Sequence, residues 1–445
     1  MDLVLNHTSD QHPWFVESRS SRTSAKRDWY YWVDGKGGRR PPNNWAARFG
    51  GSAWTYDPHT DQYYLHSFLP EQPDLNWTNP AVREAVFDVV RFWVDRGVDG
   101  FRLDAINWLG KDTSWLDNPW RFAWRSYYRQ VHRHDRDQLN THEALRALRA
   151  SLKDRGDIFL VGEASSDTPG GPAAFYGDGS NELHEVFDFR LLRSLWHPEV
   201  FRRLIVESDR AVPQGGWPPV VFSNHDQSRH IDRYGPGGDP LRRARATALL
   251  LFTLRGTPFV YYGEELGLRN GRLRRADLRD PYTIRYWLWK SGRDPARTPM
   301  PWDASAQAGF TSGKPWLPLS QDWRQTNVAC EQQDPRSMLS LYKRLIRMKK
   351  ESKALGAGTY QQIDDVPNEC LVFRRESHAG GRGEALLIAV NFSAQAREIS
   401  LPGGPSQLAH SGRLILSTDP LRAEEGGRAD RFPLGPDEGI VVSVE

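Results

Sequence analysis

GVDGFRLDAINWLG, residues 97–110, has the apolar content of a buried strand and yet contains Arg102 and Asp104. Taking an unpaired ion out of water costs several kcal/mol or more, so charged groups enter such strands in pairs. Arg102 and Asp104 are two residues apart, and side chains at that spacing leave a strand on the same face. The stretch therefore predicts a charged pair at the carboxyl end of a strand over 98–104.

Strand-like and helix-like segments alternate on both sides of this stretch. We predict strands at 3–5, 98–104, 158–163, 185–189, 218–226 and 257–265. Helices are predicted after Asn79-Pro80, before Gly156 and over 241–254, and the first of them should bury Val82, Val86, Val89, Val90 and Trp93. Such alternation is typical of α/β folds, whose active residues lie at the carboxyl ends of the strands.

Two other regions differ in composition from the alternating part. Residues 9–78 show little helical periodicity and are rich in Gly, Pro, Asn and aromatic residues, which indicates an irregular, partly β segment. Residues 355–445 contain short strands between Gly/Pro turns and predict a small antiparallel sandwich. We therefore predict four parts: 1–8, a barrel strand; 9–78, an inserted domain; 79–354, the rest of a barrel; and 355–445, the sandwich.

Composition excludes several classes of function. The formal net charge of the 445 residues is +3, which gives no general attraction to nucleic acid or to an anionic membrane. No apolar run reaches the length of about 20 residues that spans a bilayer. Cys330 and Cys370 form neither a disulfide framework nor a metal motif, and we expect two unpaired core thiols. The 18 Trp residues suit sugar binding and core packing equally.

Three predicted strands end in a carboxylate, namely Asp104, Glu163 and Asp226. The carboxyl ends of parallel strands in one barrel converge on one mouth. Two carboxylates about 5–5.5 Å apart are the equipment of a retaining glycosidase, in which one attacks the anomeric carbon and the other protonates the leaving oxygen. The pattern favours this chemistry over three unrelated surface acids.

Four segments carry a family resemblance: DLVLNH (2–7), GFRLDAINW (100–108), LVGEA (160–164) and FSNHDQ (222–227). In this order they resemble the α-amylase superfamily of glycoside hydrolases. QPDLNW (72–77) and RDPARTPMPWD (293–303) are similar to its α-glucosidase and oligo-1,6-glucosidase branch. The resemblance implies a (β/α)8 TIM barrel, with a domain inserted after the third strand and a C-terminal antiparallel β-sandwich.

The resemblance also implies roles for individual residues. Asp104 would be the nucleophile, Glu163 the acid/base, and Asp226 would hold two sugar hydroxyls. Arg102 would keep the nucleophile ionised and oriented. The remaining substrate-binding residues would be His7, His225 and Arg297; Arg297 would close the non-reducing end of the pocket, and Arg293 lies close enough in sequence to be its alternative. No metal ligand is implied among them.

The front of the chain departs from the family pattern. The family places two barrel strands before DLVLNH, so we expect an N-terminally incomplete barrel. That region would also hold a calcium-type acidic loop, and we expect no cofactor to be required for the reaction. The first residues have no signal-peptide pattern, from which we expect a cytoplasmic protein. Ala105 stands where the family tends to have Val with α-1,6 specificity and a smaller or polar residue with α-1,4.

These observations predict a retaining, exo-acting α-glucosidase on short oligosaccharides, favouring α-1,4 over α-1,6 bonds. A glucosyl transferase or isomerase such as a trehalose synthase is the alternative, since it uses the same triad while excluding water. A third interpretation is a catalytically inactive binding or transporter-subunit homologue. Such proteins lose triad residues, and Asp104, Glu163 and Asp226 are all present here. The sequence does not predict an oligomeric state.

Overall fold

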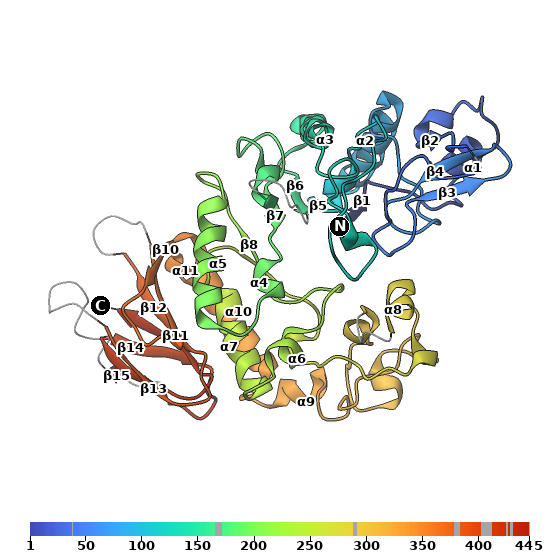
Figure 1. The fold of residues 1–445 in the computed structure, drawn as a ribbon. Coiled ribbons are helices and arrows are strands. Elements are labelled where there is room, and N and C mark those ends of the chain that lie inside the picture. The colour runs from blue at the N-terminus through green and yellow to red at the C-terminus, as the bar shows by residue number, and fades with distance from the viewer. Residues whose placement is uncertain are drawn as a thin grey trace. The chain divides into compact units, whose positions relative to one another are not determined.

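The computed structural model describes residues 1–37, 39–164, 171–287, 292–377, 383–401, 412–423, 426–427 and 430–444. The chain forms two compact units (Figure 1): the first is Met1–Phe187 with Ala211–Trp217, and the second is Asp188–Arg210 with Pro218–Glu445. Each unit has its own sheets and its own hydrophobic core.

A parallel sheet of four strands forms the centre of the first unit, in the order β1-β5-β6-β7. The strands are β1 (Asp2–Val4), β5 (Gly100–Asp104), β6 (Phe159–Glu163) and β7 (Glu185–Phe187). All three pairings are parallel, so every strand ends at the same edge of the sheet. Each of the predicted strands over 3–5, 98–104, 158–163 and 185–189 overlaps one of these four.

Helix α2 (Pro80–Val94) begins where the sequence predicts, because the Asn79 side chain accepts a hydrogen bond from the Ala81 N–H and proline occupies the first turn. Its predicted buried face is partly wrong. Val82, Val86 and Val90 are buried, together with Phe87, whereas Val89 and Trp93 are 39% and 37% exposed. Phe87 widens the buried stripe on the side opposite Val89, and Trp93 lies in the last turn of the helix, which ends at Val94.

The helical region predicted before Gly156 is much shorter than expected. Helix α3 runs only over Leu139–Ser151, and the segment between β5 and α3 contains no more than two short 3-10 turns, η2 (Ile106–Trp108) and η3 (Tyr127–Arg129). The buried Asn118 accepts hydrogen bonds from the backbone N–H groups of Arg133 and His134. A side chain that takes backbone donors in this way competes with a helix, and the segment stays a loop.

The segment predicted to be irregular and partly β contains helix α1 (Pro13–Arg19) and a small antiparallel sheet. The strand order is β2-β4-β3, with β2 at Trp32–Val33, β4 at Gln62–Leu65 and β3 at Trp54–Asp57. Tyr31, Trp45 and Tyr63 belong to its aromatic core. Many of the chain's tryptophans and tyrosines therefore serve as packing groups here.

The second unit contains a parallel pair of strands, β8 (Pro219–Val221) and β9 (Thr257–Phe259). Around them lie helices α5 (Pro198–Ala211), α7 (Pro240–Thr253) and α10 (Met338–Glu351). The strands overlap the predicted segments 218–226 and 257–265, and α7 overlaps the predicted helix over 241–254. Helix α7 is buried over most of its length and contributes heavily to the core.

The C-terminal part of the second unit is antiparallel. One sheet has the order β10-β11-β12-β17-β14-β15, and a second has β13-β16. The strands are β10 (Thr359–Ile363), β11 (Cys370–Glu376), β12 (Ala385–Asn391), β13 (Arg397–Ser400), β14 (Gly412–Ser417), β15 (Gly426–Gly427), β16 (Arg431–Leu434) and β17 (Gly439–Val444). The predicted sandwich segment 355–445 includes several residues outside the described ranges, and its exact limits stay a prediction, as do those of the other three parts.

Arg375 on β11 joins this antiparallel part to helix α7. Its side chain is fully buried and donates to the carbonyl oxygens of Thr253 at 2.6 Å and Thr359 at 2.8 Å. It also donates to the carbonyls of Leu355 and Gly358. Burial lowers the pKa of Arg375 to about 10. The end of α7 leaves carbonyls without helical partners, and this guanidinium satisfies one of them.

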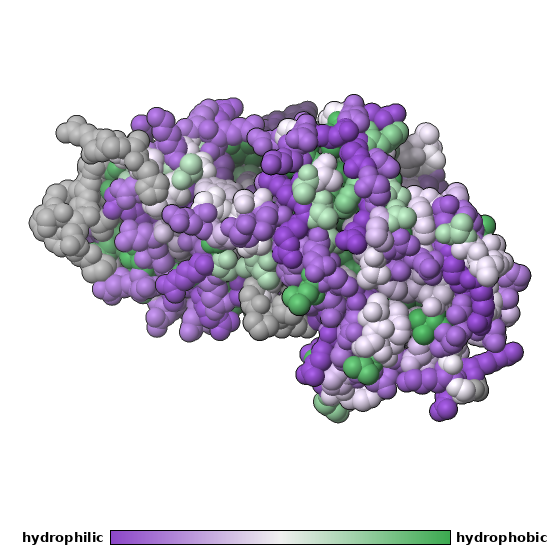
Figure 2. Space-filling view, turned by 90° about the horizontal axis from the view of Figure 1, so that it is seen from above, coloured by the Kyte–Doolittle hydropathy of each residue, from purple (hydrophilic) through white to green (hydrophobic). Residues whose placement is uncertain are grey.

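Surface properties agree with the composition. On the face shown in Figure 2 hydrophilic residues predominate, and apolar residues form small separate patches. Among the described residues, no helix is long and apolar enough to cross a membrane. Both cysteines are free thiols, as expected, but the expectation that both lie in the core is wrong for Cys330, which is exposed, while Cys370 is buried.

Candidate active site

The carboxylates of Asp104 and Glu163 lie on neighbouring strands of the first unit. Each is the last residue of its strand, and the register pairs Leu103 with Gly162 directly before them. Both side chains are largely buried, with exposed fractions of 28% for Asp104 and 18% for Glu163. Two of the three predicted catalytic residues thus lie side by side at one edge of the sheet.

Arg102 connects these two carboxylates. Its Nη1 lies 2.9 Å from Asp104 Oδ1, and its Nη2 forms an ion pair with Glu163 Oε2. Nη1 also lies 3.0 Å from Oδ1 of Asp2 on β1. Burial alone would lower the pKa of Arg102, but the charges of Glu163 and Asp104 outweigh it and the pKa is raised. The predicted charged pair in the strand is therefore a cation shared among carboxylates.

His7 follows β1 in the same unit. Its Nε2 is 2.9 Å from the side-chain nitrogen of Gln72, and its ring packs against Phe68 with centroids 5.3 Å apart. Burial lowers the pKa of His7, against the opposing charges of Asp74 and Asp104. A neutral imidazole accepts a hydrogen bond at one nitrogen and donates one at the other, which suits contact with sugar hydroxyls.

A buried ion pair beside His7 was not predicted from the sequence. Lys111 and Asp74 have almost no exposed side-chain surface, and Nζ lies 3.0 Å from Oδ2. Lys111 also donates to the Trp108 carbonyl and to Asn6 Oδ1, while Asn6 donates to Asp74. The pair connects three segments: the one after β1 that contains Asn6, the one after β4 that contains Asp74, and the one after β5 that contains Lys111. It thereby holds Asn6, the residue next to His7, in place.

The second unit holds the other predicted group. Asp226 follows β8, and its Oδ1 lies 3.0 Å from Arg297 Nη2, 3.4 Å from Arg293 Nη1 and 3.6 Å from His225 Nε2. Arg297 also donates from Nε to the His225 carbonyl at 2.8 Å. The structure thus brings His225, Asp226 and Arg297 together, and Arg293 joins them.

Asp280, like the Lys111–Asp74 pair, was not predicted from the sequence as part of the site. It accepts two hydrogen bonds from Arg293 and caps helix α8 (Pro281–Arg285) through the Tyr282 and Thr283 N–H groups. Burial would raise its pKa, but the hydrogen bonds from Arg293 and Thr283 and the charge of Arg293 outweigh burial and lower the pKa to about 2. Arg293 therefore links Asp226 to a helix cap, whereas the contacts of Arg297 within the described ranges are with His225 and Asp226.

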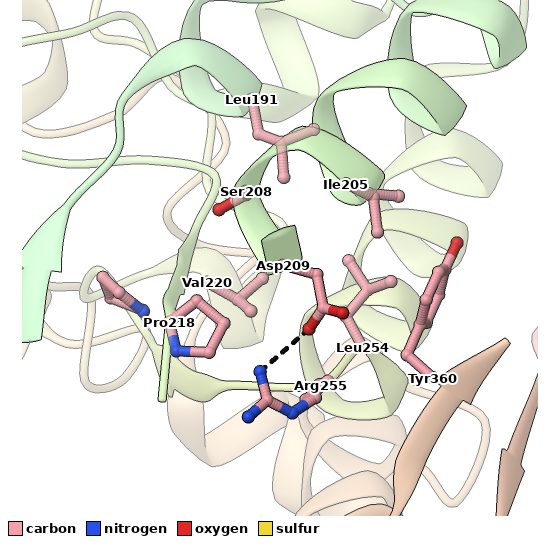
Figure 3. A pocket seen from close by; sticks show the side chains of 10 residues that line it. Leu191, Ile205, Ser208, Asp209, Pro218, Val220, Leu254, Arg255 and Tyr360 are labelled. Carbon is pink, nitrogen blue, oxygen red and sulfur yellow. Dashed lines mark hydrogen bonds and ion pairs between the residues drawn. The ribbon is translucent and has the colours of Figure 1, made fainter. Parts of the chain in front are cut away.

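A small cavity in the second unit is too small to be a sugar site. It lies beside β8 and the end of α5, between Pro218, Val220 and Leu254, with the Asp209–Arg255 ion pair at 2.8 Å on its wall (Figure 3). Its volume is about 20 Å3, which is room for about one water.

Metal ligands are not grouped in the part of the chain that the structure describes, where no three His, Cys, Asp or Glu side chains lie together as they would around an ion. The expectations of no metal among the site residues and of no required cofactor stay predictions.

Parallel strands that end in paired carboxylates, followed by an antiparallel C-terminal part, are the features of a barrel-class glycoside hydrolase. Residues 1–358 match the family described as Alpha amylase, catalytic domain. The chain belongs to this family of glycoside hydrolases, and the family and fold-class predictions are confirmed.

Proteins similar to this chain include glucosidases and a glucosyl transfer enzyme. The chain is 42% identical over 415 residues to a probable alpha-glucosidase of Rhizobium meliloti (strain 1021), covering 90% of this chain and 74% of that one. It is 35% identical over 432 residues to an oligo-1,6-glucosidase of Parageobacillus thermoglucosidasius, covering 90% and 76%. Among solved structures, the α-glucosyl transfer enzyme XgtA is 38% identical with a TM-score of 0.89, covering 100% and 82%.

Proposed function

We propose that this chain is a retaining, exo-acting α-glucosidase that hydrolyses terminal α-glucosidic bonds of short oligosaccharides. The observation that carries the proposal is the guanidinium of Arg102, which contacts both Asp104 and Glu163. One guanidinium can bridge two carboxylates only when they are close together, and close carboxylates favour double displacement over single displacement.

In this proposal Asp104 attacks the anomeric carbon and forms a β-glucosyl ester. Glu163 protonates the leaving oxygen, and in the second step it removes a proton from the water that cleaves the ester. To act as an acid, Glu163 must exchange its contact with Arg102 for one with the glycosidic oxygen. Arg102 would then stay on Asp104 and keep that carboxylate oriented towards the anomeric carbon.

The other predicted residues bind the sugar. Asp226, held by Arg297, would accept hydrogen bonds from two glucosyl hydroxyls, and His7 and His225 would bind hydroxyls near the scissile bond. Arg297 would close the non-reducing end of the pocket. A pocket closed at that end admits one terminal glucosyl unit, which is what makes the reaction exo-acting.

The linkage preference is proposed as α-1,4 over α-1,6. Its support is Ala105, which is buried and packs beside Trp108 and Tyr127 directly after Asp104. A small side chain at this point leaves more room beside the nucleophile than Val would. The relatives' names cover both preferences, since one is an α-glucosidase and the other an oligo-1,6-glucosidase.

The test of function is glucose release from maltose and isomaltose. The anomer is followed by proton NMR on an aryl α-glucoside, because its only glucose is the transferred glucosyl unit, whereas the reducing-end unit of maltose is released as both anomers. Retention predicts α-glucose as the first product, before mutarotation. Initial formation of β-glucose would contradict the two-step mechanism, and no release of glucose from either sugar would contradict the function.

Glucosyl transfer is the second candidate, favoured by the similarity to the α-glucosyl transfer enzyme XgtA. A transferase uses the same ester but passes the glucosyl group to an acceptor hydroxyl instead of water. Chromatography of the maltose products separates the two, because hydrolysis gives glucose alone, whereas transfer gives a new disaccharide or longer sugars.

A further inference from the structure

A cavity of about 430 Å3 lies in the first unit, beside helix α3 and the start of β6. Its volume falls within the range of about 300–1,000 Å3 that is usual for small-molecule sites. Ile158, directly before β6, lines it, whereas Glu163 ends that strand, so the cavity and the candidate catalytic residues lie at opposite ends of β6. Its charged and polar lining residues are Arg146, Arg149, Lys153, Asp157, Ser180 and Asn181.

The cations of this cavity outnumber its acids. Arg146, Arg149 and Lys153 are spaced three and four residues apart, which places them on one side of the helical segment. Arg146 is already paired with the buried Glu182 at 2.8 Å. Within the described ranges, neither Arg149 nor Lys153 forms an ion pair with a carboxylate, and Asp157 is the single acid of the lining.

Arg149 also lacks a good neutral acceptor. Its Nη1 contacts both ring nitrogens of His184, Nδ1 at 2.6 Å and also Nε2. The Leu160 N–H already donates to Nδ1 at 2.9 Å, so a neutral ring carries its proton on Nε2. A neutral imidazole has one acceptor nitrogen, so the two donors compete for a single lone pair. Burial lowers the pKa of Arg149, and burial with the Arg149 charge lowers the pKa of His184 to about 4. The charge of Asp157 opposes the lowering of the Arg149 pKa without outweighing burial, so the half-buried guanidinium is only partly compensated.

We propose that this cavity binds a phosphate group, as inorganic phosphate or on a sugar phosphate, through Arg149 and Lys153. A phosphate dianion balances the two cations, neither of which forms an ion pair with a carboxylate within the described ranges, although the charge of Asp157 acts on Arg149. Its planar guanidinium allows Arg149 to donate two parallel hydrogen bonds, and Lys153 acts as a point charge. Asn181 accepts the Asp178 N–H at its Oδ1, which leaves its amide N–H groups to donate to a third phosphate oxygen.

Isothermal titration of the whole chain with inorganic phosphate, glucose 6-phosphate and glucose, at constant ionic strength, tests the proposal. We expect saturable binding of phosphate. Tighter binding of glucose 6-phosphate would identify a sugar phosphate as the ligand, and equal binding would identify free phosphate. Arg149→Met and Lys153→Met should each weaken phosphate binding about tenfold or more, the value of a hydrogen bond to a charged group.

Arg133→Met is the matched control, because Arg133 is exposed and does not line the cavity. It removes the same charge and should leave phosphate binding unchanged, and Arg149→Met should leave glucose release from maltose unchanged. Absence of saturable phosphate binding, or wild-type affinity in Arg149→Met, would overturn the proposal. If circular dichroism shows that Arg149→Met is unfolded, phosphate binding is measured in Lys153→Met and Asn181→Leu instead. Wild-type phosphate affinity in both variants would overturn the proposal.

Discussion

The two units each contain a charge cluster, and the two clusters have opposite compositions. In the first unit the single cation Arg102 contacts the carboxylates of Asp2, Asp104 and Glu163. In the second unit the anion Asp226 contacts two arginines, one of which also holds Asp280. The first cluster has an excess of negative charge when ionised, whereas the carboxylates and guanidiniums of the second balance.

The difference indicates what each cluster is suited to do. A glycosidic bond breaks through a transition state with positive charge at the anomeric carbon, which excess negative charge stabilises. A network with zero net charge does not stabilise that positive charge in the same way, but its hydrogen bonds hold each side chain in place. The cluster around Arg102 therefore fits bond breaking, and the cluster around Asp226 fits positioning of the sugar.

Asp104→Asn should have the largest effect, because no covalent ester can form at an amide. We expect glucose release from maltose to fall by more than about a thousandfold, the scale seen when a nucleophile is removed. Asp2→Asn is the matched control, since Asp2 contacts the same Arg102 atom but is exposed. Comparable losses in both variants would show that Asp104 acts through its ion pair with Arg102 and not as the nucleophile.

Glu163→Gln should have a large effect that depends on the leaving group. Proton donation contributes about 10²–10⁴-fold to a reaction that needs it, so kcat/KM on maltose should fall by at least about a hundredfold. An aryl glucoside with an acidic phenol leaves without a proton, and its first step should be largely spared. Equal losses on both substrates would remove Glu163 from the acid role.

Arg297→Met tests the positioning role of the second cluster. Asp226 would keep Arg293 but lose its shorter contact, and we expect kcat/KM on maltose to fall about tenfold or more, with KM raised. Arg293→Met breaks the link to Asp280 as well, so it should lower Tm more than Arg297→Met does. The reverse order of Tm values would contradict the link through Arg293 to Asp280, and a larger loss of kcat/KM in Arg293→Met than in Arg297→Met would assign the pocket arginine to position 293.

Asp280→Asn should lower the stability of the folded chain at neutral pH but not at low pH. The pKa of Asp280 is lowered from 3.8 to about 2 by its surroundings, so the folded state favours the ionised form. The contribution to stability is present above about pH 4 and is lost as the pH falls through 2. We therefore expect the variant to have a lower Tm than the original chain at pH 7 and nearly the same Tm at pH 2. A constant difference across this range would contradict the cause given for the shift.

The strand ends could be predicted from the sequence because the signal there is local. Charges inside an apolar run, as at Arg102 and Asp104, cost too much unless they are paired, so their presence predicts the pair. The Lys111–Asp74 and Arg293–Asp280 ion pairs could not be predicted in this way. Their members are not neighbours in one apolar strand, and only the fold decides which distant residues meet. The loop before α3 was missed for a related reason, since Asn118 takes backbone donors from residues well beyond it.

Ala105→Val should have the smallest effect, and the structure changes how it must be tested. Added bulk beside Asp104 should lower the ratio of kcat/KM on maltose to that on isomaltose by a few-fold, about the value of one or two methyl contacts in a pocket. Ala105 has φ of +50°, a conformation that β-branched residues rarely adopt. Val at this position is therefore strained, and part of any loss of activity would come from lower stability. Ala105→Gly is the matched control, because it relieves the backbone without adding bulk. If Val shifts the ratio and Gly does not, side-chain size beside the nucleophile sets the linkage preference. If both variants shift it alike, the backbone turn after β5 sets it instead.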